Sequence, residues 1–79
     1  MSVLVFIEMK AKDVSLAKEQ LEEMEYVLAF YELVSDFNVA VIAELENEDA
    51  LFEFLALKVR TIPGIRESRT HIIQDGIAF

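Results

Sequence analysis

The sequence predicts an α+β domain of the split-βαβ, or ferredoxin-like, arrangement, in which a four-stranded antiparallel sheet carries two helices on one face. Segments with apolar residues at every second position alternate with segments whose apolar residues recur every three or four positions. These are the spacings of strands and of helices. Their order along the chain is βαββαβ. Because 79 residues suffice for only one small core, we expect a single domain over residues 1–79.

The first strand is predicted over residues 3–10 and the first helix over residues 13–25. Apolar side chains alternate along one face of the strand: Val3, Val5, Ile7 and Met9. In the helix they fall at intervals of three and four residues: Val14, Ala17, Leu21 and Met24. Asp13 precedes this series and suits the N-cap position, where a side-chain oxygen accepts from a free backbone N–H group.

Two further strands are predicted over residues 26–34 and 38–45, which read YVLAFYELV and NVAVIAEL. The short stretch between them, residues 35–37, has about the length of a hairpin turn. The two strands should therefore pair antiparallel.

The second helix is predicted from residue 48 to about residue 61, with Asn47 as its N-cap. Pro63 and Gly64 follow it, and they predict a sharp helix-to-strand corner. Proline lacks an amide hydrogen, and glycine can take the positive φ that closes a helix end. The last strand is predicted over residues 65–74, followed by a turn at residues 75–76 and a short apolar tail.

The strands are apolar on both faces, although two helices can cover only one face of such a sheet. In the hairpin, for example, Leu28 and Phe30 alternate with Ala29 and Tyr31. An exposed apolar sheet face exceeds what soluble monomers usually tolerate, so we expect a second copy to pack on it about a two-fold axis. The product would be a dimeric α/β sandwich or barrel. The second helix is apolar on more than one side and is a candidate contact between dimers.

Composition narrows the classes of function. The formal net charge is -8, from 15 acidic and 7 basic residues, which disfavours direct binding to nucleic acid. Four basic residues near the C-terminus are interpreted as a solvated rim: Lys58, Arg60, Arg66 and Arg69. The absence of cysteine and of an apolar run long enough to cross a membrane favours the cytoplasm as the location.

Chemistry-bearing residues are sparse. The only histidine, His71, lies in a predicted strand without a metal-ligand or catalytic partner at a recognisable spacing. Neither a glycine-rich phosphate loop nor a cofactor motif occurs. We therefore expect no enzyme, no metal and no cofactor. Two alternatives stay open, a small dimeric α/β-barrel enzyme of the cofactor-free oxygenase or isomerase type and a purely structural module without a ligand.

Two stretches resemble the effector-binding domain of regulators of the leucine-responsive regulatory protein/AsnC family. The first is IPGIRESRT, in which Ile62, Pro63, Gly64, Ile65 and Thr70 match that family's helix, proline, glycine, valine and strand with a threonine. The second is ELVSDFNVAVIAEL, which is similar to the family's strand, turn and strand built around glycine, an acidic residue, an aromatic residue and aspartate. These four places read Ser35, Asp36, Phe37 and Asn38. The chain starts directly at the first effector-domain strand, so it resembles a version without the helix-turn-helix domain.

The resemblance implies dimers formed through the sheets, rings of about eight or more subunits, and small amino-acid-like ligands bound where dimers meet. It also implies co-assembly with full-length regulators of the same family. The implied ligand-binding residues are those of the turn and the C-terminal strand: Ser35, Asp36, Phe37, Asn38 and Thr70. Asn38 and Ser35 stand where the family has aspartate and glycine. We therefore expect Asn38→Asp to tighten amino-acid binding, because a charge-assisted hydrogen bond is stronger than a neutral one.

Overall fold

The computed structural model describes residues 2–77 and confirms the βαββαβ order. Its elements, in chain order, are β1 (Val3–Ala11), α1 (Val14–Glu22), β2 (Val27–Glu32), β3 (Val39–Leu45), α2 (Glu48–Glu53), η1 (Phe54–Val59) and β4 (Ile65–Ile73). The segment η1 continues α2 with the wider winding of a π-helix. The predicted boundaries agree with these to within three residues at each end, apart from the change of winding inside the second helix.

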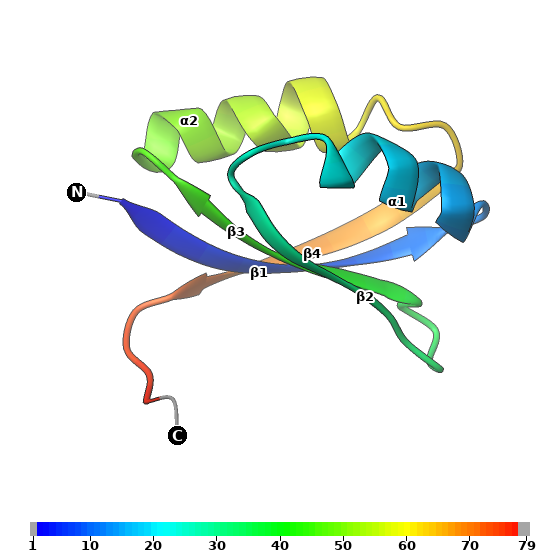
Figure 1. Cartoon of the computed structure of the whole chain (residues 1–79), viewed down its shortest axis with the longest axis horizontal. Helices are drawn as coiled ribbons and strands as arrows, with labels where there is room; N and C mark the ends of the chain where they lie inside the picture. The colour runs from blue at the N-terminus through cyan, green and yellow to red at the C-terminus, as the bar shows by residue number, and fades with distance from the viewer. Residues whose placement is uncertain (1, 78–79) are drawn as a thin grey trace.

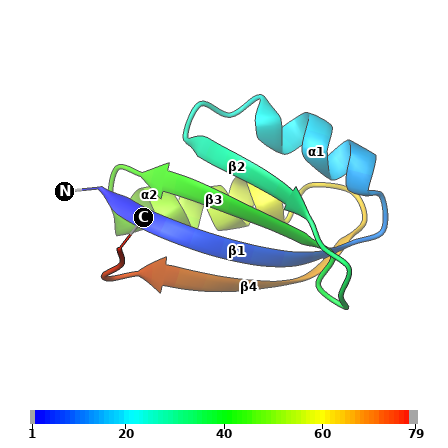
Figure 2. The ribbon, with the colours of Figure 1, turned by 60° about the horizontal axis from the view of Figure 1, so that its bottom comes forward.

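The four strands form one antiparallel sheet in the order β2-β3-β1-β4. Both helical segments lie on the same side of this sheet, and the other side carries no element (Figure 1). Figure 2 shows β4 and β2 as the two edge strands, with β1 and β3 between them. The predicted two-layer fold is therefore confirmed.

Local hydrogen bonds at the helix ends agree with the sequence. The side chain of Asp13 accepts from the backbone N–H group of Leu16 at 3.1 Å, and that of Asn47 accepts from the N–H group of Ala50 at 2.8 Å. Gly64 has a φ of 85°, the positive value expected at the corner before β4. Its carbonyl accepts from the N–H group of Lys12 at 2.9 Å, which ties this corner to the end of β1.

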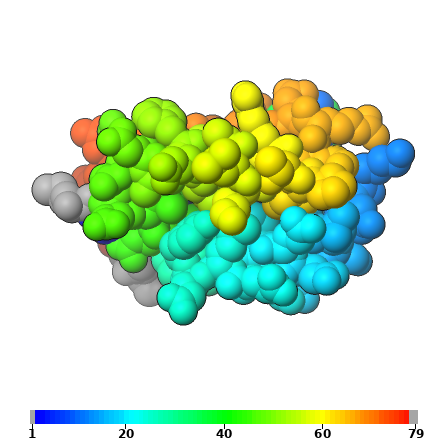
Figure 3. Space-filling model, turned by 90° about the horizontal axis from the view of Figure 1, so that it is seen from above, coloured from blue at the N-terminus to red at the C-terminus, as the bar shows by residue number. Residues whose placement is uncertain are grey.

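The core lies between the sheet and the helices. Its strand residues come from the alternating positions of β1 and β3, and its helix residues come from α1 and the α2–η1 segment. The buried members include Val5, Ile7, Met9, Val39, Val41, Ala17, Leu21, Leu51, Phe54 and Val59. Figure 3 views the helical layer from above, where α1 and the yellow-green α2–η1 segment lie side by side over the sheet.

Two irregularities were not predicted. The β2–β3 register shifts between Val27 and Ala29, so Leu28 leaves the alternation and is 58% exposed. In the second helix, η1 buries Phe54 and Val59 but leaves Leu57 exposed.

The expected turn at residues 75–76 is absent, because residues 74–77 take no regular structure. The end of the apolar tail lies outside the described residues.

The sheet face opposite the helices is apolar over only part of its area. The apolar residues on it come mainly from β2, β3 and the first half of β1, with one at the end of β4: Leu4, Phe6, Ala29, Tyr31, Ala40, Ile42 and Ile73. The adjoining part, formed by the second half of β1 and by β4, is charged or polar: Glu8, Lys10, Glu67, Arg69 and His71. We call the whole surface the open sheet face. Its apolar part is smaller than the sequence suggested, because β4 contributes mainly polar side chains.

Candidate functional site

The loop that joins β2 to β3 lies at one corner of the open sheet face, and Asn38 fixes it there. The side-chain Nδ2 of Asn38 donates to the carbonyl of Ala11 at 2.9 Å, and its Oδ1 accepts from the N–H group of Ala11 at 2.8 Å. The backbone carbonyl of Asn38 also accepts from the N–H group of Leu33 at 2.8 Å, which closes the loop. Asn38 therefore extends the pairing of β3 with β1 one step beyond the last regular pair, Met9 with Val39.

Phe37 is the anchor of the loop. It is buried, and the guanidinium of Arg69 on β4 lies 3.8 Å from its ring centroid. The ammonium of Lys10 on β1 lies 5.0 Å from the same centroid. Both distances are within the range of cation–π attraction. The aromatic residue of the loop thus joins the loop to two strands that are distant from it in the sequence.

Ion pairs surround this anchor. The Nζ of Lys10 lies 3.2 Å from a carboxylate oxygen of Asp36 and 3.3 Å from one of Glu67. Hydrogen bonding to Asp36, and next to Glu67, raises the pKa of Lys10 above its ordinary value of 10.5. On the same face, Glu8 lies 3.5 Å from the Nε of Arg69. Because one partner of each pair, Asp36, Glu67 or Arg69, is more than half exposed, the main effect of these pairs is on orientation and not on stability.

A small hollow of about 180 Å³ opens beside the loop and is lined by Lys10, Ala11, Asp36, Asn38 and Arg66. Two of these residues are cationic and one is anionic, so the hollow offers partners for both charges of a zwitterion. The side-chain amide of Asn38, however, is already hydrogen-bonded to the backbone of Ala11. Ser35 is likewise engaged, since its hydroxyl donates to the carbonyl of Phe37.

Of the five predicted site residues, four lie together in the loop and one does not join them. Thr70 pairs with Ile7, a core residue, so its side chain lies on the helix side of β4. Its neighbour Arg69 lies on the open sheet face beside Phe37. Successive residues of a strand point to opposite faces, which separates Thr70 from the loop within one chain.

His71 is half exposed on the open sheet face, in agreement with its interpretation as a residue of the sheet. Its Nε2 lies 3.0 Å from Glu8, and its ring centroid lies 5.8 Å from that of Phe6. Within residues 2–77, no group of three potential ligands could hold a metal ion. None of the helices in this part of the chain is long and apolar enough to cross a membrane.

The basic residues near the C-terminus do not form one surface. Arg69 lies on the open sheet face and pairs with Glu8, whereas Lys58 lies on η1 in the helical layer. Arg60 and Arg66 line a hollow at the start of β4 together with Glu67. A phosphate backbone would therefore meet separated cations with carboxylates among them.

Three residues at the loop were not selected from the sequence as ligand contacts: Lys10, Ala11 and Arg66. Lys10 could have been found from its alternation with Glu8 on the less apolar side of the first strand. Ala11 offers no signal, because it contributes only its backbone groups.

Comparison with known proteins gives one family. Residues 2–77 match the family described as the Lrp/AsnC ligand binding domain. A comparison with curated protein sequences finds no match.

Solved structures show the same fold. The structure of E. coli AsnC is 24% identical with a TM-score of 0.85, over 98% of this chain and 54% of that one. A hypothetical protein from Pyrococcus horikoshii is 26% identical with a TM-score of 0.82, over 89% of this chain and 87% of that one. A feast or famine regulatory protein from M. tuberculosis, complexed with L-methionine, is 22% identical with a TM-score of 0.80, over 98% and 53%. The chain thus spans about half the length of the AsnC and M. tuberculosis proteins.

Proposed function

The chain belongs to the Lrp/AsnC ligand binding domain family, and we propose that it is an oligomeric sensor of a small amino-acid-like metabolite. The family is one of regulatory effector-binding domains and not of enzymes, which agrees with the expectation of a non-catalytic protein. The proposed role includes assembly with copies of itself and with full-length regulators of the same family in the cytoplasm. It includes no binding to DNA by this domain alone, because the domain is acidic and its cations are dispersed.

The observation that carries the proposal is the loop anchored at Phe37 and the hollow beside it. Asp36 supplies an anionic partner for an ammonium group, and Arg66 supplies a cationic partner for a carboxylate. Hydrogen bonds to charged groups are stronger than those between neutral groups, so this pair suits a zwitterion. The M. tuberculosis regulator complexed with L-methionine supports an amino acid as the ligand class.

The proposal also includes self-association of the chain through the apolar part of the open sheet face. Tyr31 on the open sheet face is 48% exposed in the single chain, and Phe6, Ala29 and Ile42 are partly exposed beside it. Covering this apolar part with a second copy removes it from water, and the charged part at Glu8 and Arg69 forms a polar rim. If Thr70 contacts the ligand, it does so from a neighbouring subunit of the ring, because within one chain it lies on the other side of its strand from Arg69.

The test is native mass spectrometry of the purified chain with and without each of the common amino acids, followed by calorimetry on any that binds. The proposal expects a dimer or larger ring, and a bound mass on it. Asp36→Asn and Arg66→Gln should each weaken binding by about two- to fivefold, the range for one exposed charge interaction. Glu22→Gln on α1, distant from the loop, is the matched control.

An assembled protein that binds no amino acid would contradict the sensor and favour an assembly module without a ligand. Binding that is insensitive to both loop variants would place the ligand elsewhere.

A further inference from the structure

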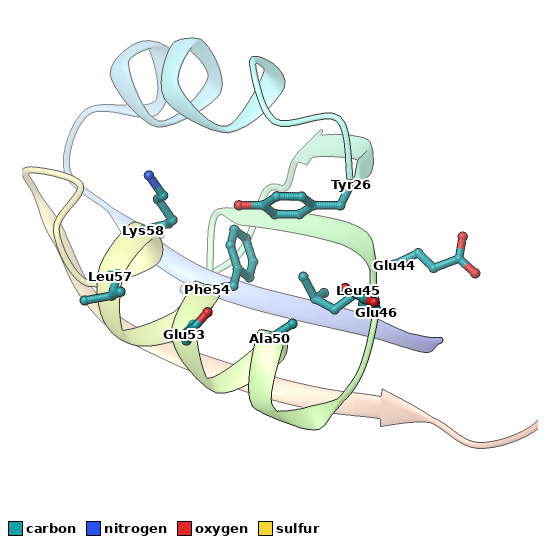
Figure 4. Close-up of a pocket in the computed structure, with 9 residues that line it drawn as sticks. All are labelled: Tyr26, Glu44, Leu45, Glu46, Ala50, Glu53, Phe54, Leu57 and Lys58. Atoms are coloured by element: carbon teal, nitrogen blue, oxygen red, sulfur yellow. The ribbon is translucent and has the colours of Figure 1, made fainter. Parts of the chain in front are cut away.

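A second cavity lies at the opposite end of the β2–β3 hairpin from the loop. It has a volume of about 440 Å³, which is within the range of small-molecule sites. Figure 4 shows that its residues come from the start of β2, the end of β3 and one side of the α2–η1 segment: Tyr26, Glu44, Leu45, Glu46, Ala50, Glu53, Phe54, Leu57 and Lys58.

The floor of this cavity is apolar and aromatic. The rings of Tyr26 and Phe54 meet edge to face, with centroids 5.2 Å apart and an interplanar angle of 87°. The buried Leu45 and the half-buried Ala50 continue the floor beside them (Figure 4). Burial raises the pKa of Tyr26 above its ordinary value of 10.0, so this ring is neutral at physiological pH. The floor therefore suits an apolar or aromatic body.

The rim of the cavity is acidic. It carries two glutamate side chains, Glu46 and Glu53, against one lysine, Lys58. Glu44 lines the cavity through its backbone, because its side chain lies on the open sheet face with that of its cross-strand partner Leu4. Figure 4 shows Glu46 beside Leu45 and Lys58 on the other side of Phe54, so the end of the cavity at Glu46 has no cation of its own. The carboxylate of Glu44 accepts a hydrogen bond from the hydroxyl of Ser2 at 2.8 Å on the open sheet face, so it is directed away from the cavity.

The helix wall of the cavity is also irregular. Phe54, Leu57 and Lys58 belong to the π-helical segment η1, which ends with the N–H group of Arg60 donating to the carbonyl of Leu55 at 3.0 Å. Short π-helical segments cost stability relative to regular α-helix and occur often at functional sites. Here the wider winding places Leu57 and Lys58 at the mouth of the cavity.

We propose that this cavity binds a small primary amine with an aromatic or branched apolar body and no carboxylate. The body packs on Tyr26, Phe54 and Leu45, and the ammonium group lies beside Glu46, with Glu53 on the facing helix. An ammonium group also gains from the faces of the two aromatic rings. A carboxylate on the same ligand would meet two glutamates, and this repulsion selects an amine over the corresponding amino acid. The proposal is independent of the loop and of its ligand.

Phenethylamine, L-phenylalanine and 3-phenylpropionate share one ring and differ only in charged groups, so they are matched probes. Each is titrated into the assembled protein labelled with ¹⁵N, and amide shifts are followed by NMR. Phenethylamine should shift the amides of Tyr26, Ala50 and Phe54 at millimolar concentration. Phenylalanine should bind this cavity more weakly, and phenylpropionate should not bind it. Shifts confined to residues 33–38, or equal binding of amine and acid, would overturn the proposal.

Variants separate the two parts of the cavity. Replacing the exposed rim glutamates by Glu46→Gln and Glu53→Gln should weaken phenethylamine binding by about four- to twentyfold, at two- to fivefold for each charge. Glu32→Gln, an equally exposed glutamate at the far end of β2, is the control and should change nothing. Ala50→Leu should fill the floor and abolish binding. An affinity unchanged in the folded Gln pair, or no shift with phenethylamine at all, would refute an amine site.

Discussion

The side-chain amide of Asn38 pairs with the backbone of Ala11 through two hydrogen bonds, across 27 residues of sequence. Both groups of Ala11 are satisfied by one side chain, in the manner of a neighbouring strand. Only an amide can supply both the donor and the acceptor that this arrangement needs. Asn38 is therefore a structural residue of the loop.

This arrangement changes the expected outcome of Asn38→Asp. A carboxylate can accept from the N–H group of Ala11 but cannot donate to its carbonyl, and it faces that carbonyl oxygen with a negative charge. Losing one partner in a partly buried site costs about 1–3 kcal/mol. We expect chemical denaturation to show a loss of that size for Asn38→Asp and a smaller one for the exposed control Asp36→Asn.

Any gain in amino-acid affinity from the new carboxylate has to be measured against this loss of loop order. Calorimetry on Asn38→Asp at a temperature where it stays folded would do so. Full stability in this variant would show that the Asn38–Ala11 pairing contributes little.

Gly64 should be intolerant of a side chain. Its φ of 85° is in the left-handed region, and an added Cβ would lie 3.1 Å from the Cβ of Lys12. The conformation alone costs about 1–2 kcal/mol for a residue with a Cβ. Gly64→Ala should therefore lower the free energy of unfolding by at least that amount. Gly76→Ala, where nothing lies within 4 Å, is the matched control. Equal stabilities for the two variants would contradict the constraint at the corner.

Assembly through the open sheet face should depend on Tyr31. Tyr31→Lys places a charge in the apolar part of that face, where burial against a second copy would desolvate it. Because Tyr31 is already 48% exposed, the fold of the single chain should survive, and light scattering should report a smaller species. Ala40 is a poor choice for this test, since it is only 1% exposed and a lysine there would disturb the subunit itself.

The helical layer offers a second test of assembly. Phe52 and Leu57 are 61% and 63% exposed, so they are free to contact another dimer. If they join dimers into rings, the double variant Phe52→Lys, Leu57→Lys should stop at the dimer, whereas Tyr31→Lys should reach the monomer. A mass unchanged by either set of substitutions would exclude both surfaces as interfaces.

The stability of the protein should fall at alkaline pH. Burial raises the pKa of Tyr26 above 10.0, and pairing with Asp36 and Glu67 raises that of Lys10 above 10.5. For both groups the folded state holds its proton more tightly than the unfolded state does. Their contributions are therefore complete below about pH 10 and are lost as the pH rises through the two raised values.

In a Tyr31→Phe background Tyr26 is the only tyrosine, so its ionisation can be followed by ultraviolet absorbance. The midpoint should lie above 10.0 in the folded protein and return to about 10 in urea. An identical midpoint in both states would contradict the burial of this ring.

The sequence by itself determined the features that depend on neighbours along the chain. The spacing of apolar residues placed all four strands and both helices, and single residues placed the caps at Asp13 and Asn47 and the corner at Gly64. These features arise from hydrogen bonds and backbone preferences that span three or four residues, so a local pattern is enough to reveal them.

Only the tertiary structure decided which residues meet around the loop. Strand register placed Thr70 on the helix side while bringing Arg69 onto Phe37, and it directed the amide of Asn38 to Ala11. A shift of one residue in the pairing register would exchange the two faces of a strand. The residues of β4 do not by themselves indicate which register the strand takes. The bulge at Leu28 and the π-helical winding of η1 likewise arise from fitting strands and helices around a shared core, which no short segment records.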